Sequence, residues 1–128
     1  MARFVHLIRV VHPGPTLLNA AAAFTLAQIA GASMHRALLA AVTMVGAHAF
    51  IGTLNDLLDR HVDSDRKEKP IATGSISVRA GTVIAVLCVL IGLIAATALG
   101  QLSLLIATLG ISLGVAYDLG VKIGRAHV

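Results

Sequence analysis

Long stretches without a charged residue alternate with short polar segments along this chain. No Asp, Glu, Lys or Arg occurs in residues 10–35, 37–55 or 80–117. The last of these stretches is long enough for two membrane spans, and Gly100-Gln101-Leu102-Ser103 near its middle predicts the turn between them. The pattern therefore predicts an all-α polytopic membrane helix bundle. Its four transmembrane helices are expected at roughly residues 15–34, 37–55, 79–99 and 102–119.

The composition agrees with a chain that lies mostly in a lipid bilayer. Of the 128 residues, 57% are hydrophobic and 12% are charged, whereas a soluble domain has roughly a quarter charged residues. The hydrophobicity excludes intrinsic disorder, and the single cysteine, Cys88, excludes a disulfide scaffold. A net charge of +4 would point to nucleic acid in a soluble protein. Because the chain has three Phe, one Tyr and no Trp for base stacking, we expect no nucleic-acid partner.

The distribution of basic residues predicts the orientation in the membrane. Four spans would place the N-terminus, the 56–78 loop and the C-terminus on one side. Nine of the ten basic residues fall on that side: Arg3, Arg9, Arg60, Arg66, Lys67, Lys69, Arg79, Lys122 and Arg125. Only Arg36 falls on the other. Since cytoplasmic loops carry an excess of Lys and Arg, we expect an integral protein of the cell membrane with its N-terminus and 56–78 loop in the cytoplasm.

The polar loop after the second predicted span holds the residues best suited to chemistry. Asp56, Asp59 and Asp63 are spaced i, i+3, i+7, which on a helix places three carboxylates on one stripe. Such a stripe needs a cation, and its hard oxygens suit Mg²⁺, which often bridges to substrate phosphates. The basic residues Arg66, Lys67 and Lys69 that follow could hold phosphate oxygens. The alternative is a solvated loop of mixed charge.

The same residues resemble a known family. Asn55-Asp56-x-x-Asp59-x-x-x-Asp63 is similar to the first aspartate-rich motif of the UbiA superfamily of intramembrane prenyltransferases. The stretch Lys69-Pro70-Ile71-Ala72-Thr73-Gly74-Ser75-Ile76 is similar to the segment that follows that motif. Arg9-Val10-Val11-His12-Pro13 resembles the segment before the first helix, and Tyr117 followed by Lys122 resembles the end of the fourth. The resemblance covers about residues 4–122.

The resemblance implies a prenyl group transfer from a prenyl diphosphate to a lipophilic, often aromatic, acceptor. Mg²⁺ held by Asp56, Asp59 and Asp63 would neutralise the leaving diphosphate, with help from Asn55, Arg66, Lys67 and Lys69. Asn19, Tyr117 and Lys122 would contribute to the acceptor pocket. The implied fold has about nine helices, of which this chain would supply the first half.

The chain departs from the family pattern at its C-terminal end. No second Asp-x-x-x-Asp motif follows Val78, so we expect a truncated chain that is inactive alone. Residues 1–122 would be the N-terminal part of the prenyltransferase domain. Residues 123–128 would be a non-native tail, because one back-translation of them matches a common sequencing adapter. The alternatives are a noncatalytic membrane half-subunit and a transporter fragment, although transporter carboxylates normally lie near mid-membrane.

Overall fold

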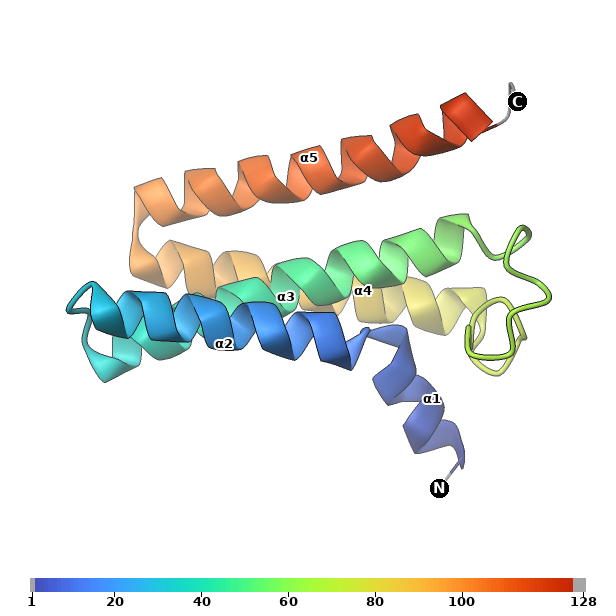
Figure 1. Cartoon of the computed structure of the whole chain (residues 1–128), viewed down its shortest axis with the longest axis horizontal. Coiled ribbons are helices and arrows are strands. Elements are labelled where there is room, and N and C mark those ends of the chain that lie inside the picture. The colour runs from blue at the N-terminus through green and yellow to red at the C-terminus, as the bar shows by residue number, and fades with distance from the viewer. Residues whose placement is uncertain (1, 126–128) are drawn as a thin grey trace.

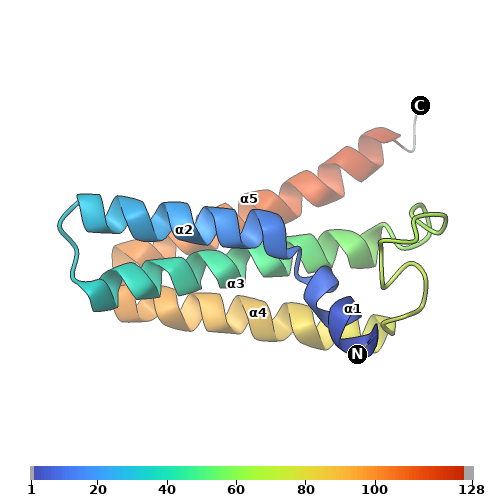
Figure 2. The ribbon, with the colours of Figure 1, turned by 60° about the horizontal axis from the view of Figure 1, so that its bottom comes forward.

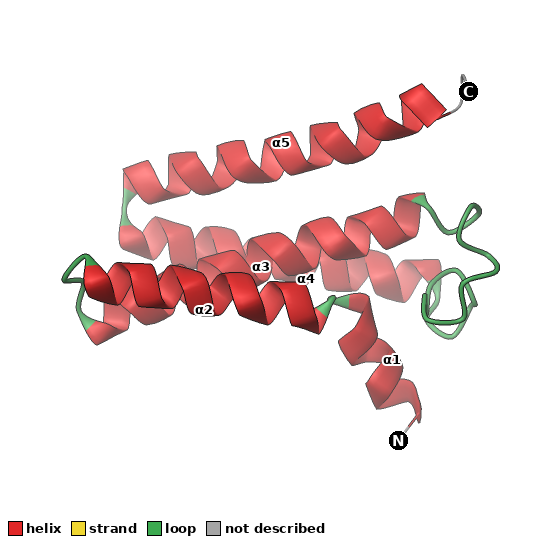
Figure 3. Ribbon diagram, viewed as in Figure 1, coloured by secondary structure: helices red, strands yellow, loops and turns green. Residues whose placement is uncertain are grey.

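The described residues form five helices. A computed structural model describes residues 2–125, and the side chains of residues 4–120. The helices are α1 (Ala2–Val10), α2 (Pro13–Ile29), α3 (Met34–Leu58), α4 (Val78–Leu99) and α5 (Gln101–Arg125). No strand occurs among the described residues, so the predicted all-α class is confirmed. The long loop 59–77 lies at one end of the bundle, and the connections between the other long helices are short (Figures 1 and 3).

The four long helices run in alternating directions, with α3 at the centre. It packs against α2 on one side and α4 on the other (Figure 2), and α5 contacts both α3 and α4. The start of α2, the end of α3 and the start of α4 meet at the loop end, where α1 turns away from the bundle (Figure 1). The loop end therefore gathers segments that lie far apart in the sequence.

The tightest helix pair is α3 with α4, and two glycines permit the approach. A Cβ added to Gly46 would lie 2.5 Å from the Cα of Gly92, closer than side-chain carbons are found in proteins. Ala95 and Ala96 are buried in the same helix as Gly92. Small residues at a helix crossing let the two backbones touch, which stabilises helix pairs in lipid through van der Waals packing.

Among the residues that the structure describes, three helical segments are long and apolar enough to cross a membrane: Met34–Leu58, Val78–Leu99 and Gln101–Gly120. The predicted first span does not reach residue 34, because α2 ends at Ile29 after 17 residues. Gly31, with φ +80°, and the N-cap Ser33 turn the chain before α3. At 1.5 Å per residue α2 measures about 25 Å, a little less than the ~30 Å hydrocarbon core of a bilayer.

Both ends of α4 coincide with residues that cap or end helices. The Ser77 hydroxyl accepts a hydrogen bond from the Ala80 N–H, so Ser77 is the N-cap of α4. Gly100, with φ +125°, makes the predicted turn to α5 by itself. At the same end of the bundle, the Arg36 guanidinium donates to the Leu99 carbonyl at 3.1 Å. A cation at this position satisfies a helix C-terminus.

Most large apolar side chains lie on the outside of the bundle. The buried apolar cluster is small and sits near the loop end: Val10, Leu57, Ile71, Ile76 and Ala85. In contrast, leucines and isoleucines along the outer faces of α2, α4 and α5 are more than half exposed, among them Leu18, Ile29, Ile94 and Leu113. Outward apolar faces are expected where lipid, rather than water, surrounds the helices.

Candidate active site

The aspartate motif begins on a helix and continues in a folded loop. Helix α3 ends at Leu58, and Asp59 is its C-cap, with its N–H donating to the Asn55 carbonyl at 2.9 Å. The predicted helical stripe of three aspartates is therefore wrong, since only Asp56 is helical. The N–H groups of Val62 and Asp63 both donate to the Asp59 carbonyl, which turns the chain back at the helix end. This turn, rather than helical spacing, determines where Asp63 lies.

Asp56 is the buried acid of the cluster, and a basic side chain lies against each of its two oxygens. The Lys69 amino group donates to Oδ1, and His12 Nε2 lies 3.1 Å from Oδ2. The Asp56 residue is only 2% exposed. A buried carboxylate without partners would cost several kcal/mol in lost hydration, so these contacts are what allows Asp56 to be buried.

Lys69 also reaches a second carboxylate. Its Nζ lies 3.8 Å from Asp63 Oδ2, while Arg66 Nε lies 3.5 Å from Asp63 Oδ1. Two aspartates seven residues apart thus face one ammonium group. This is the cation that their mutual repulsion calls for.

The C-terminal half of the loop anchors Lys69. Pro70 is fully buried, and Ile71 and Ile76 belong to the buried apolar cluster. The Ile76 N–H donates to the Pro70 carbonyl at 3.0 Å, which closes the segment into a compact turn. Gly81 leaves room for the Ile71 side chain, whose Cδ1 would lie 2.7 Å from an added Cβ. The backbone that carries Lys69 is therefore fixed by the packing of the residues that follow it, and the lysine side chain extends into the site.

His12 comes from the junction between α1 and α2, 44 positions before Asp56. Its backbone is left-handed, with φ 50° and ψ 63°, which breaks the helix and redirects the chain. Two contacts fix the junction on α3. The Thr53 hydroxyl donates to the Val10 carbonyl at 3.1 Å, and the His12 ring lies against Gly52, where an added Cβ would be 2.8 Å from Cδ2.

Spacing along the sequence does not single out His12, because its contact with Asp56 is set by tertiary packing. The signal that could point to it is the Arg9–Pro13 segment, which resembles the family segment before the first helix.

A polar cleft of about 410 Å³ opens beside these residues. Asp56, His12 and Lys69 form part of its wall, together with Arg9 and Glu68, and the first residues of α2, Pro13-Gly14-Pro15, complete it. Three of the five polar side chains in the wall are basic. The cleft can therefore take an anion of small size while presenting a carboxylate to any cation that accompanies it.

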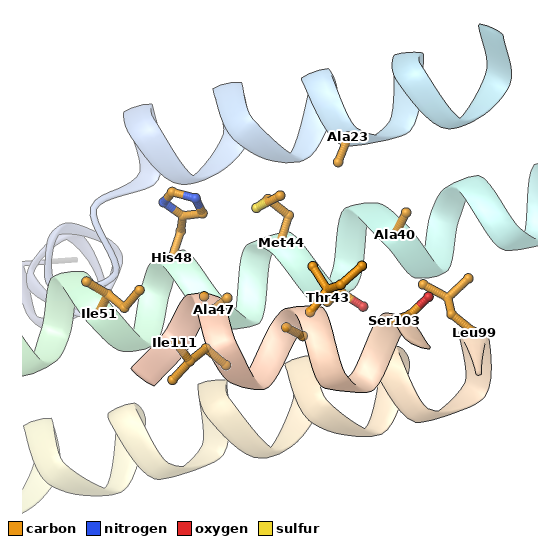
Figure 4. A pocket seen from close by; sticks show the side chains of 13 residues that line it. Ala23, Ala40, Thr43, Met44, Ala47, His48, Ile51, Leu99, Ser103 and Ile111 are labelled. Atoms are coloured by element: carbon orange, nitrogen blue, oxygen red, sulfur yellow. The ribbon is translucent and has the colours of Figure 1, made fainter. Parts of the chain in front are cut away.

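A second, apolar cavity of about 470 Å³ lies farther along the bundle, between α2, α3 and α5. Most of its wall is aliphatic, as Figure 4 shows, with polar groups from Thr43, His48 and Ser103. His48 precedes Asp56 by eight residues on α3, so about 12 Å of helix separates the two positions.

The wall of the polar cleft includes none of the remaining predicted site residues whose side chains the structure describes. Asn55 is half-buried at the end of α3, and Lys67 is exposed in the loop. The Asn19 amide donates to the Pro15 carbonyl of its own helix at 2.9 Å, and Tyr117 is 70% exposed on α5. Lys122, and the tail expected at 123–128, lie outside the described side chains. Among the described residues no three His, Cys, Asp or Glu side chains are grouped as metal ligands.

One comparison with known proteins gives a match. The model of a family described as the UbiA prenyltransferase family matches residues 16–126. The match begins after the α1–α2 junction and extends four residues past the expected domain end at 122. No curated protein and no solved structure matches the chain significantly.

Proposed function

We propose that this chain, which belongs to the UbiA prenyltransferase family, supplies the part of a Mg²⁺-dependent intramembrane prenyltransferase that carries the first aspartate-rich motif. The donor is a prenyl diphosphate and the acceptor is lipophilic. The observation that carries this proposal is the buried Asp56 at the end of α3, which faces a basic cleft and shares a cation with Asp63.

The carboxylates suit Mg²⁺ in their chemistry and placement. The Lys69 ammonium already occupies a position that both Asp56 and Asp63 face. Hard oxygens from two carboxylates, completed by water and diphosphate oxygens, are typical of Mg²⁺ in proteins. Asp59 is the third carboxylate of the proposed set. When bound, Mg²⁺ would neutralise charge that develops on the leaving diphosphate.

The basic side chains of the loop would hold the diphosphate. Lys69 lies in the cleft wall, and Arg66 and Lys67 precede it in the same loop. Asn55 would orient the group by hydrogen bonding. Arg9 and His12, which were not expected from the sequence, line the same cleft, and Arg9 adds a positive charge to it. Charge of this kind stabilises the departing diphosphate as the C–O bond breaks.

The apolar cavity would receive the isoprenoid chain. Its aliphatic wall excludes water, which protects an allylic cation from hydrolysis. Asn19, Tyr117 and Lys122 remain the proposed acceptor residues, on the strength of the family resemblance alone.

The proposed topology has α2 as a fourth span beside the three long apolar helices. It runs alongside α3 and is free of Asp, Glu, Lys and Arg (Figure 2). The loop end of the bundle, which carries the basic residues, would then face the cytoplasm.

The test is binding of a radiolabelled prenyl diphosphate to the purified chain in lipid nanodiscs, with and without Mg²⁺. Binding is the direct readout, because a second aspartate motif is missing from residues 78–128. Asp56→Asn should weaken Mg²⁺-dependent binding on the order of a hundredfold, since it removes a buried charge at the cation site. Asp65→Asn, an exposed change in the same loop, should stay within about twofold.

Equal binding by wild type, Asp56→Asn and Asp65→Asn would contradict the proposal. Mg²⁺-dependent binding without any prenyl transfer by the wild-type chain would support the half-site form of the proposal.

A further inference from the structure

Lys69 lies where the proposed metal would bind. Its ammonium contacts Asp56 Oδ1 and lies 3.8 Å from Asp63 Oδ2, and the side chain is 15% exposed. The Asp56 and Asp63 side chains are 1% and 15% exposed. The three groups form a nearly enclosed unit in which one cation serves two carboxylates.

This unit accounts for how the carboxylates coexist without a metal. Two carboxylates that face the same point repel each other, and the repulsion is strong away from bulk water. A buried acid that loses its partner is strongly destabilised. Lys69 removes both costs. The residues that follow it are fixed, because Pro70 is fully buried and Ile71 belongs to the buried apolar cluster, and they hold the lysine in place.

The same geometry makes Lys69 a competitor of any divalent cation. A metal and an ammonium group cannot both contact Asp56 Oδ1 without repelling each other. The ammonium group can leave the carboxylates only if another anion pairs with it. The Lys69 side chain lines the cleft that would take the diphosphate. A diphosphate in the cleft offers the lysine that anion.

We propose that Lys69 occupies the cation position of Asp56 and Asp63 in the resting protein, and that it moves to the diphosphate when this ligand arrives. The metal and the diphosphate therefore bind together, and the metal alone binds weakly. This inference rests on the proposed function, and it adds an order of binding that Lys69 controls.

The experiment measures Mn²⁺ binding by electron paramagnetic resonance, with the chain in nanodiscs and inorganic diphosphate as the second ligand. The protein-free Mn²⁺–diphosphate complex is measured separately and subtracted. Without diphosphate, Lys69→Met should bind Mn²⁺ on the order of tenfold more tightly than wild type, because the competing charge is gone. Diphosphate should raise the Mn²⁺ affinity of wild type on the order of tenfold, and that of Lys69→Met by less than about threefold.

Arg79→Met is the control. It removes a positive charge from an exposed position at the start of α4, at the loop end of the bundle, so screening should limit its effect on Mn²⁺ affinity to about twofold. Lys69→Arg keeps the charge and should resemble wild type. Lys69→Gln repeats the test with a side chain that can still donate to Asp56, should the methionine variant fail to fold.

The outcomes separate the two proposals. If Lys69→Met and Lys69→Gln bind Mn²⁺ no more tightly than Arg79→Met, while wild type binds Mn²⁺ with diphosphate, the role of Lys69 is refuted and the proposed function stands. If no variant and no wild-type sample binds Mn²⁺ under either condition, both proposals fail.

Discussion

Gly52 sets how closely His12 can approach Asp56. The imidazole occupies the space that a β-carbon at position 52 would need, with only 2.8 Å to the nearest ring carbon. Thr53, the residue after Gly52, donates a hydrogen bond to the Val10 carbonyl. This bond ties the backbone near His12 to α3, so the histidine cannot easily move away from Gly52. Gly52 on α3 thus makes room for His12, which belongs to the α1–α2 junction.

Gly52→Ala should therefore displace the His12 ring and lower stability. The expected loss is about 1–3 kcal/mol, the usual cost of overpacking a tight contact. Diphosphate binding should weaken as well, since His12 lines the cleft. Gly120→Ala, where an added Cβ meets nothing within 4 Å, is the control and should be neutral or slightly stabilising. Unfolding in mixed micelles gives the stability of both variants, and equal stabilities would rule out the steric role of Gly52.

The individual site residues differ in how far sequence could identify them. Asp56, Asp63 and Lys69 were predicted because charged residues are rare in this chain, so a cluster of them at a span's end is conspicuous. Their partnership was not predicted, because the loop turns at Asp59 rather than continuing α3. His12 was missed altogether, since its role depends on a left-handed junction that places it against a helix 40 residues later.

Among the elements, α3 and α4 form the firmest pair, and their contact is one of backbone against backbone. A β-carbon on Gly46 would lie 2.5 Å from the Gly92 Cα and 2.6 Å from the Cys88 carbonyl oxygen. No side-chain rotation can relieve these clashes, so the helices themselves must separate. The α4–α5 and α3–α5 contacts are sparser, and α5 diverges from its neighbours toward its C-terminal end (Figure 1).

Gly46→Ala should cost more stability than Gly52→Ala, at least about 2–3 kcal/mol, because backbone atoms have to move. Gly110→Ala on α5 is matched in residue type and helical position, and its Cβ would meet nothing within 4 Å. Denaturant titration of the helical signal in micelles should rank Gly46→Ala well below Gly110→Ala. A Gly46→Ala protein as stable as Gly110→Ala would show that α3 and α4 do not pack this closely.

Helix positions were predicted well where charge or a strong breaker marked an end, and poorly elsewhere. The span expected at residues 79–99 corresponds to α4 (Val78–Leu99) to within one residue at each end, and its C-terminal end is marked by Gly100. The end of α2 was placed five residues too late, because Ala30–Ser33 are small and uncharged and hydropathy does not distinguish them from a helix. Helix α1 was not predicted as an element, since nine residues that include charges give no membrane signal.

At the scale of the whole molecule, polar chemistry is concentrated at one end. The loop 59–77, the start of α2 and the α1–α2 junction all meet there, while the opposite end has two short turns and Arg36 (Figures 1 and 2). In the proposed orientation the basic residues of the loop end face the cytoplasm. The outer faces are apolar and exposed over the lengths of α4 and α5, as lipid contact requires.

Thiol labelling in sealed membrane vesicles should report this orientation. Ser64→Cys in the loop and Ser33→Cys at the opposite turn, each combined with Cys88→Ser, place one thiol at either end. A membrane-impermeant maleimide should label Ser64→Cys in inside-out vesicles and Ser33→Cys in right-side-out vesicles. Labelling of both from the same side would show that α3 does not cross the membrane.

The burial of Pro70 has a consequence for how the loop can be cut. The segment from His61 to Glu68 is largely exposed, whereas Pro70 and Ile71 are packed into the core. A protease that cleaves after basic residues therefore has access to Arg66 and Lys67, while the bond after Lys69 is protected by the proline that follows it. A single nick would leave both carboxylates on one fragment and their lysine on the other. The cation site would then itself be a noncovalent bond between two separate polypeptides.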